Sequence, residues 1–318
     1  MSKNTLPPQT DLTNSASLDE QKSESVPTTP ERIPLQAKIP KIDRAIFAHR
    51  MVQFGILATL LWKWSFFRVV DDVYDQFPLE DPFFPEWLRS TLVFRIAFLS
   101  AVWMGITNLI TSRPQIRRWC SWITLLATST LCIHQGSYND MTFVTAWWTS
   151  LWAIWYVYRL EQEEEPILLR KAAFLSRLII SLILLGGGVG KWTAEYWSGA
   201  VLYDIYFVDR DYWVFNILRS TANPDMLREI SLWYSRQVVV LETVAGLGLW
   251  LLPARLAGLI GMIFLTAIAI FSNMLLFSVV SCLIALAGVG LLVPRKKGQS
   301  EQIQAVRNPS GKQTAAVD

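Results

Sequence analysis

Lys191 is the residue of this chain whose type and position most strongly suggest chemistry at a membrane. It ends an apolar run and directly follows a glycine cluster that includes Gly186 and Gly190. Small residues four positions apart let a second helix or a flat ligand approach the backbone closely. A lysine removed from water loses part of its preference for the charged form and can act as a general base. The alternative is an interfacial lysine that anchors the end of a helix.

Three further ionisable residues, His134, Arg95 and Glu242, lie within long apolar stretches. His134 is predicted to lie on the same side of the membrane as Lys191, either as a catalytic group or as a hydrogen-bonded residue at a helix end. A charge at the centre of a bilayer costs roughly 2.5 to 3.5 kcal/mol on insertion scales. We therefore expect Arg95 and Glu242 to satisfy each other as a structural ion pair between two helices.

The sequence favours neither a metal site nor nucleic-acid binding. Its cysteines, Cys120, Cys132 and Cys282, lie in apolar stretches without a CxxC pair, which is typical of buried structural thiols. The formal net charge is only +3, and the basic residues are scattered between apolar blocks. A nucleic-acid-binding face would instead concentrate them with aromatic residues.

Membrane-spanning helices are the elements that must position these residues. The chain is 52% hydrophobic, contains 15 Trp and is only 17% charged, a composition too apolar for an ordinary soluble domain. A span needs about 20 mostly apolar residues. The sequence therefore predicts an all-α fold, a polytopic integral membrane bundle of about eight transmembrane helices. The predicted spans cover residues 51–67, 91–111, 119–137, 141–158, 172–190 and 232–252, followed by two spans within 256–294 that turn near Ser272 to Ser278.

The predicted transmembrane domain, residues 44–294, lies between two tails. Residues 1–43 are rich in Ser, Thr and Pro and are expected to be a disordered cytoplasmic tail, and residues 295–318 a basic, disordered one. A polar segment, residues 192–231, is expected on the outer side. Most basic residues fall in the loops that are inner if the N-terminus is cytoplasmic. We therefore expect a protein of the cell (inner) membrane with both termini in the cytoplasm.

A family resemblance begins at Lys191. The run GVGKWTAEYWSG, residues 188–199, resembles the lysine-containing motif of the vitamin K-dependent γ-carboxylase and HTTM (horizontally transferred transmembrane) family. Glu195 matches the acidic residue of that motif, Tyr196 or Trp197 its aromatic residue, and Gly199 its final glycine. Further along, Glu242 looks like the next membrane acid of the family, and Arg255 like the arginine at the following helix boundary.

The resemblance implies a base in a cavity for an amphipathic ligand. In the carboxylases the equivalent lysine deprotonates vitamin K hydroquinone, so Lys191 would be the catalytic base and a quinol the cofactor or ligand, with His134 as a neighbouring catalytic candidate. The expected ligand-binding residues are Gly188, Gly190, Glu195, Tyr196, Trp197 and Glu242.

Three departures from the family pattern argue against full carboxylation. No histidine follows His134, the lysine pair of the motif is reduced to Gly190 and Lys191, and no large β-rich region follows the last predicted span. The sequence leaves open whether the protein is an enzyme at all. A reduced, carboxylase-like enzyme acting on a quinol or lipid-like molecule in the bilayer is one hypothesis. A non-catalytic membrane scaffold or accessory subunit is its rival. A transporter is a third and less favoured choice, because the sequence shows neither the internal repeat nor the paired broken helices of transporters.

Overall fold

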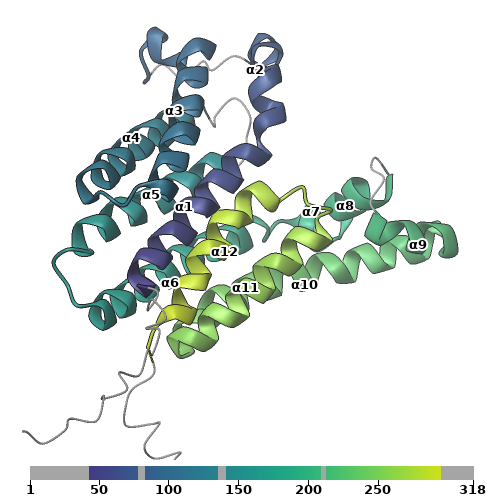
Figure 1. The fold of residues 1–318 in the computed structure, drawn as a ribbon. Coiled ribbons are helices and arrows are strands. Elements are labelled where there is room, and N and C mark those ends of the chain that lie inside the picture. The colour runs from purple at the N-terminus through teal and green to yellow at the C-terminus, as the bar shows by residue number, and fades with distance from the viewer. Residues whose placement is uncertain (1–42, 78–82, 135–140, 209–212, 295–318) are drawn as a thin grey trace, which may run out of the picture. The chain divides into compact units, whose positions relative to one another are not determined.

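The computed structural model describes residues 43–77, 83–134, 141–208 and 213–294, and every regular element in these ranges is helical (Figure 1). The predicted tails, residues 1–42 and 295–318, lie outside the described residues. Eight helices of 16 to 28 residues overlap the eight predicted spans, although several begin seven or eight residues earlier than predicted. They are α1 (Arg44–Trp62), α3 (Thr91–Ile110), α4 (Pro114–Ile133), α5 (Thr142–Arg159), α6 (Glu165–Gly190), α10 (Pro224–Leu251), α11 (Ala254–Phe271) and α12 (Phe277–Leu292).

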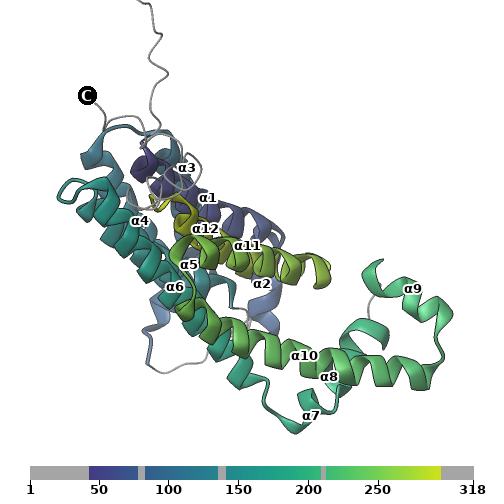
Figure 2. The same cartoon turned by 90° about the horizontal axis from the view of Figure 1, so that it is seen from below.

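Shorter elements connect the long helices. The segment between α1 and α3 contains α2 (Trp64–Gln76) and the 3-10 turn η1 (Glu86–Arg89). The predicted outer polar segment contains α7 (Ala194–Trp197), α8 (Ala200–Tyr203), a π-helical turn (Asp204–Val208) and α9 (Trp213–Thr221). Figure 2 shows α7, α8 and α9 near the N-terminal end of α10. The predicted turn between the last two helices is found at residues 272–276, where Asn273 and Met274 have positive φ angles.

Four of the described helices are long and apolar enough to cross a membrane: α1, α3, α6 and α11. Helix α12 is a shorter apolar helix. Apolar residues also remain exposed on these helices, for example Trp103 on α3 and Ile263 on α11, with exposed fractions of 66% and 62%. Such outward-facing residues fit a lipid environment better than water. The all-helical fold is thus confirmed for the described residues, whereas the number of eight spans stays a prediction.

Long helices that follow one another in the chain run in opposite directions, and so do several pairs that are distant in sequence. Helices α1 and α12, from opposite ends of the domain, lie side by side in Figure 1, with Thr59 Oγ1 2.6 Å from Ser281 Oγ and Gly55 packed on Ala285. In α5 and α1, Tyr156 Oη near the end of one helix donates to the carbonyl of Ala45 at the start of the other, at 2.9 Å. This alternation is what successive membrane crossings with short connections would produce.

Because successive helices alternate in direction, many of the arginines lie at one end of the bundle, here named the basic end. It comprises the first turns of α1, α4, α6 and α11 and the last turns of α3, α5, α10 and α12. Cross-contacts define it: Trp122 Nε1 donates to Tyr158 Oη at 3.0 Å, and Asn108 Nδ2 to Ser121 Oγ at 3.3 Å. The basic residues at this end are Arg44, Arg50, Arg113, Arg117, Arg118, Arg159, Arg170, Lys171 and Arg255. This end corresponds to the side that the sequence predicts to be cytoplasmic.

Helices α11 and α12 are in direct backbone contact. A Cβ atom added to Gly258 would lie 2.6 Å from the carbonyl oxygen of Ala287. A Cβ atom added to Gly290 would lie 2.5 Å from the carbonyl oxygen of Ala254. The two glycines also face each other, because the Cβ added at Gly290 would lie 3.1 Å from the Cα of Gly258. In lipid the hydrophobic effect does not drive helices together, so close packing through small residues such as these glycines stabilises their association.

Candidate functional site

An ion pair between Lys191 and Glu242 is the centre of the candidate site. Lys191 is the C-cap of α6, and its Nζ contacts both carboxylate oxygens of Glu242 on α10, with Oε2 at 2.6 Å. The Lys191 side chain is 24% exposed and that of Glu242 is 11% exposed. The sequence identified both residues but not their pairing. A two-oxygen contact of this kind holds the end of α6 against the middle of α10.

The helices approach closely at this point through glycines, but not through the predicted pair. A Cβ added at Gly188 would lie 2.8 Å from Thr243 Oγ1, and one added at Gly187 would lie 3.3 Å from Glu242 Oε2. A Cβ added at Gly186 or Gly190 would instead have no neighbouring atom within 4 Å. Of the two alternatives for Gly186 and Gly190, close approach of a helix is therefore not found, because the helical phase turns Gly187 and Gly188 toward α10, and approach of a flat ligand stays a prediction. Gly188 lies in this helix interface, while Gly190 is accessible.

The motif that follows Lys191 is fastened to α10 by hydrogen bonds to its backbone carbonyls. Ser235 Oγ donates to the carbonyl of Tyr196, and Arg236 Nε donates to the carbonyl of Trp197 at 3.3 Å. Ser231 Oγ donates to the carbonyl of Gly199 at 2.8 Å. The carbonyls of Tyr196 and Gly199 also accept the backbone amides of Gly199 and Tyr203, so the serines of α10 bond to the second lone pair of each carbonyl. The sequence did not reveal the serines, which follow one face of α10 at a spacing of four.

Gly199 needs to be glycine. Its φ of +81° lies in the left-handed region, and an added Cβ would lie 2.6 Å from both the amide nitrogen and the Cα of Leu232. The chain therefore turns at this position directly on the backbone of α10. The family motif ends in a glycine, and the geometry gives that glycine a physical reason in this chain.

The aromatic and acidic residues of the motif have different surroundings. Trp197 stacks on Trp192 with ring centroids 5.0 Å apart, and the guanidinium of Arg236 lies 5.8 Å from the Trp197 ring. Burial raises the pKa of the Tyr196 hydroxyl, and the nearby negative charge of Glu242 adds to that rise. Glu195 is exposed to solvent. The Tyr196 hydroxyl thus lies within the electrostatic influence of Glu242, whereas the Glu195 side chain faces solvent.

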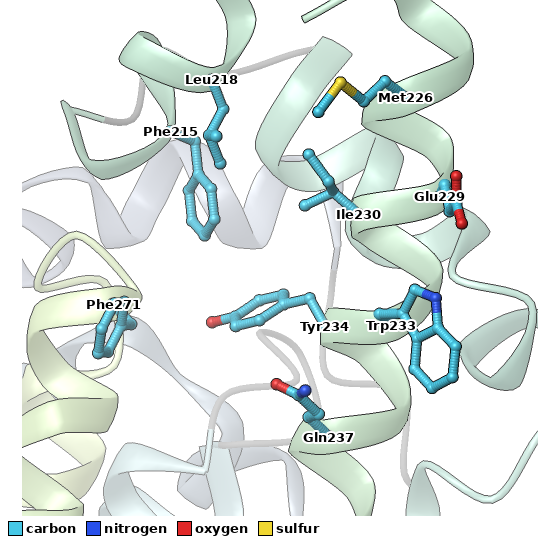
Figure 3. A pocket seen from close by; sticks show the side chains of 9 residues that line it. All are labelled: Phe215, Leu218, Met226, Glu229, Ile230, Trp233, Tyr234, Gln237 and Phe271. Atoms are coloured by element: carbon cyan, nitrogen blue, oxygen red, sulfur yellow. The ribbon is translucent and has the colours of Figure 1, made fainter.

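A cavity of about 540 Å³ opens between α9, α10 and the end of α11 (Figure 3). Its walls are mostly apolar and aromatic. In Figure 3 the hydroxyl of Tyr234 and the amide of Gln237 point into the space between Phe215 and Phe271, whereas Trp233 points to the other side of α10. The lining residues are Phe215, Leu218, Met226, Glu229, Ile230, Trp233, Tyr234, Gln237 and Phe271.

The cavity and the ion pair share helix α10. Tyr234 precedes Glu242 by about two helical turns, or roughly 12 Å along the axis. The sequence predicted a cavity that contains Lys191 itself, whereas the lining of this cavity is formed by α9, α10 and α11. The predicted ligand contacts of the motif are therefore displaced from this cavity by the packing of the motif against the opposite side of α10.

Comparison with known proteins gives no name to this arrangement. No protein-family model, curated protein or solved structure matches the chain. The resemblance to the HTTM and γ-carboxylase family stays a hypothesis, and the function has to be argued from the geometry.

His134 is held by a separate set of contacts. It is the C-cap of α4 and is buried, with Nε2 2.9 Å from the carbonyl of Leu88 and Nδ1 2.6 Å from Tyr74 Oη. A carbonyl only accepts, so Nε2 carries the proton and Nδ1 of the neutral ring accepts from Tyr74. Among the described residues no hydrogen bond or ion pair joins His134 to Lys191. This geometry supports the structural reading of His134, a residue that ties α4 to α2 and η1.

The predicted ion pair between Arg95 and Glu242 is not formed. Arg95 Nη2 lies 2.6 Å from Asp71 Oδ2 on α2, while Glu242 is paired with Lys191. Hydrogen bonds from Thr91 and Arg95 lower the pKa of the Asp71 carboxyl group. The prediction was wrong because Arg95 is only one turn into α3, where an acid on the connecting helix α2 reaches it more easily than Glu242 on α10.

Arg95→Gln is therefore expected to have a small effect. The Asp71 side chain is 57% exposed and that of Arg95 is 31% exposed, and water screens the attraction between charges this exposed, so the pair stabilises the fold only weakly. The melting temperature of the purified protein in detergent should fall by no more than about 3 °C. Asp71→Asn is the matched control and should give the same small change. A large drop for Arg95→Gln alone would show that the contact of the Arg95 guanidinium with the Phe67 ring, at 5.2 Å, contributes more than the ion pair.

His49 is a buried polar residue that the sequence reasoning did not single out. It lies within α1, its ring is stacked at 6.4 Å on Tyr156, and its Nε2 is 3.5 Å from Gln53 Nε2. The predicted first span began at residue 51 and so left His49 outside the membrane domain's core. The spacing of four between His49 and Gln53 was the signal available, since it places both on one helical face.

Proposed function

We propose that this protein is a polytopic membrane protein that binds a quinol-like or lipid-like amphipathic ligand in the cavity between α9, α10 and α11. The proposal includes eight spans, cytoplasmic termini and the cell membrane as its location. The cavity of about 540 Å³ is the observation that carries it. Ligand sites are typically concave, mostly apolar, and furnished with a few polar groups that orient the ligand.

The lining of the cavity matches an amphipathic molecule with a flat polar ring. Phe215 and Phe271 offer aromatic faces to such a ring, and aromatic pairs of this kind stabilise by about 0.5–1.5 kcal/mol beyond the area they bury. The Tyr234 hydroxyl and the Gln237 amide can bond a ring hydroxyl or a headgroup oxygen. The exposed apolar side chains of Met226 and Phe271, at 53% and 48%, would accompany an apolar tail toward lipid.

A catalytic role for Lys191 belongs to the same proposal only if the family resemblance is functional. In that case the Lys191 ammonium would first pass a proton to the Glu242 carboxylate. The free amine would then take a proton from a quinol that reaches the ion pair from the cavity, about two helical turns away along α10, and leave it as a quinolate. The ion pair equally supports the second candidate, a non-catalytic scaffold or accessory subunit, because both Lys191 and His134 already have structural partners. The two candidates differ in whether Lys191 must be able to lose a proton.

Extraction of the purified full-length protein should release a quinone, quinol or other amphipathic lipid in about stoichiometric amount, identified by mass spectrometry. Phe271→Ala removes one exposed wall of the cavity, and Gln237→Leu removes a polar group at nearly constant size. In each variant the amount of co-purifying ligand should fall by a factor of about five or more, since each substitution removes roughly 1 kcal/mol or more of contact energy.

Trp103→Ala is the matched control, because it removes an exposed aromatic side chain of α3 that does not line the cavity. It should retain the ligand at the level of the unchanged protein. Equal retention in all the variants, or no co-purifying amphipathic molecule, would contradict ligand binding in this cavity and leave the scaffold candidate.

A further inference from the structure

Arg44 and Arg255 converge on one pocket at the basic end. Arg44 is the first residue of α1 and Arg255 the second residue of α11, so residues from distant parts of the chain meet here. Together with Leu291 and Leu292 of α12 they form the described lining of this pocket. Two cations therefore lie above an apolar floor, at the boundary where two membrane-crossing helices begin.

Neither arginine is neutralised by an acid within the described part of the chain. Three other bases at this end are paired: Arg118 with Glu161, and both Arg159 and Lys171 with Glu163. Arg44 and Arg255 are exposed and take part in none of the described ion pairs. The acid nearest to Arg44 in sequence, Asp43, uses its Oδ1 to cap the amides of Ala45 and Ile46.

The start of α11 adds a second attraction for an anion. Its N-cap is Pro253, which makes no side-chain capping hydrogen bond, so the positive end of this helix is not offset by a capping side chain. From Arg255 an exposed apolar stripe runs along α11 away from the basic end. The stripe consists of Leu256, Leu259, Ile260 and Ile263, with exposed fractions of 43%, 47%, 42% and 62%.

We propose that this pocket binds the phosphate of an anionic phospholipid, with the acyl chains along the exposed stripe of α11. Guanidinium groups bind phosphate oxygens through two parallel hydrogen bonds, and two of them suit one phosphate. Basic pockets between transmembrane helices on the cytoplasmic side are where anionic headgroups bind. The stripe favours a lipid over a soluble phosphate, which would have no use for an apolar surface.

This site is separate from the proposed ligand cavity. Arg255 follows the C-terminal end of α10, whereas the cavity lies toward the N-terminal end of α10, with Gln237 about 20 Å from Leu251 along the helix axis. Phe271→Ala and Gln237→Leu should therefore leave anionic lipid binding unchanged. Failure of one proposal consequently leaves the other intact.

Native mass spectrometry of the full-length protein in detergent, titrated with phosphatidylglycerol or phosphatidylcholine, tests the proposal. The protein should retain phosphatidylglycerol in preference to phosphatidylcholine. The double variant Arg44→Gln with Arg255→Gln should bind phosphatidylglycerol at least about tenfold more weakly, since each basic residue near a membrane surface contributes roughly fivefold. The control is Arg50→Gln with Arg113→Gln, which removes the same charge from exposed positions outside the described lining and should change the preference little.

Three outcomes would overturn the proposal. Unchanged phosphatidylglycerol binding in the Arg44 and Arg255 double variant would place the lipid elsewhere. An equal loss in the Arg50 and Arg113 control would reduce the effect to overall charge. Displacement of the lipid by glycerol 3-phosphate at millimolar concentration would assign the pocket to a soluble phosphate compound instead of a membrane lipid.

Discussion

Glu242→Gln is expected to lower the melting temperature of the detergent-solubilised protein by roughly 5 to 10 °C. The change leaves the Lys191 ammonium facing a neutral amide at the contact of α6 and α10, where the side chains are only 24% and 11% exposed. Removing one partner of a buried pair costs about 3 to 5 kcal/mol, and the remaining exposure of Lys191 reduces this to about 2 to 3 kcal/mol. Thermal unfolding followed by tryptophan fluorescence measures the shift.

Two further variants separate the clamp from a general base. Lys191→Met combined with Glu242→Leu removes both charges and should recover most of the lost stability, because buried pairs can be replaced by apolar residues of similar volume. Lys191→Arg keeps the charge and the pairing but cannot serve as a base, because guanidinium does not deprotonate in proteins. If Lys191→Arg is stable yet loses a ligand-dependent phenotype, the catalytic candidate gains. A normal phenotype supports the clamp and the scaffold candidate.

Sequence periodicity and span length predicted where the long helices lie, because these depend on local composition. The uncharged stretch from Leu256 to Pro294 is too long for one span, and the chain turns within it at residues 272–276, where the sequence predicted the turn. The same reasoning cannot count membrane crossings with certainty for helices of mixed polarity. Helix α10 begins with a polar half that packs on α7 and α8, so its composition averages two environments.

The sequence did not predict which side chains pair across helices. Lys191, Glu242 and Arg95 were all recognised as costly charges, but which acid meets which base depends on helix neighbours that no local pattern specifies. The cost of an unpaired charge predicts that each has a partner, not its identity. The partner of Arg95, Asp71, lies in the connecting helix α2, outside the eight predicted spans. The motif lysine and glycine were found from sequence, whereas the serines of α10 that hold the motif were not.

The cavity was also missed, since its walls come from three separate elements. Phe215, Tyr234 and Phe271 are far apart in sequence and unremarkable as isolated aromatic residues in an apolar chain. Only the placement of α9 beside α10 makes them face a common space. The sequence thus predicts a ligand site at Lys191, whereas the walls of this separate cavity follow from tertiary packing.

Gly290→Val is expected to have the largest effect of any single substitution considered for this chain. A Cβ at this position would lie 2.5 Å from the carbonyl oxygen of Ala254, and a backbone atom cannot move aside as a side chain can. Overpacking a tight interface costs typically 1–3 kcal/mol, and a rigid backbone contact exceeds that range. Helices α11 and α12 must then separate, and α12 also packs on α1 and α6. We expect little monodisperse protein after detergent extraction, measured by size-exclusion chromatography of a fluorescent fusion.

Gly186→Ala is the matched control, because it adds a side chain to a helix interior at a glycine with no neighbouring atom within 4 Å of the added Cβ. It should leave the elution profile unchanged and can raise stability by up to about 1 kcal/mol, since alanine has the higher helix propensity.

Gly258→Ala should resemble Gly290→Val in direction, because its Cβ would meet the carbonyl oxygen of Ala287 at 2.6 Å. A folded, monodisperse Gly290→Val protein would show that α11 and α12 do not cross at these glycines. The basic-end pocket depends on that crossing, since Arg255 lies beside Leu291 only while the two helices remain in contact.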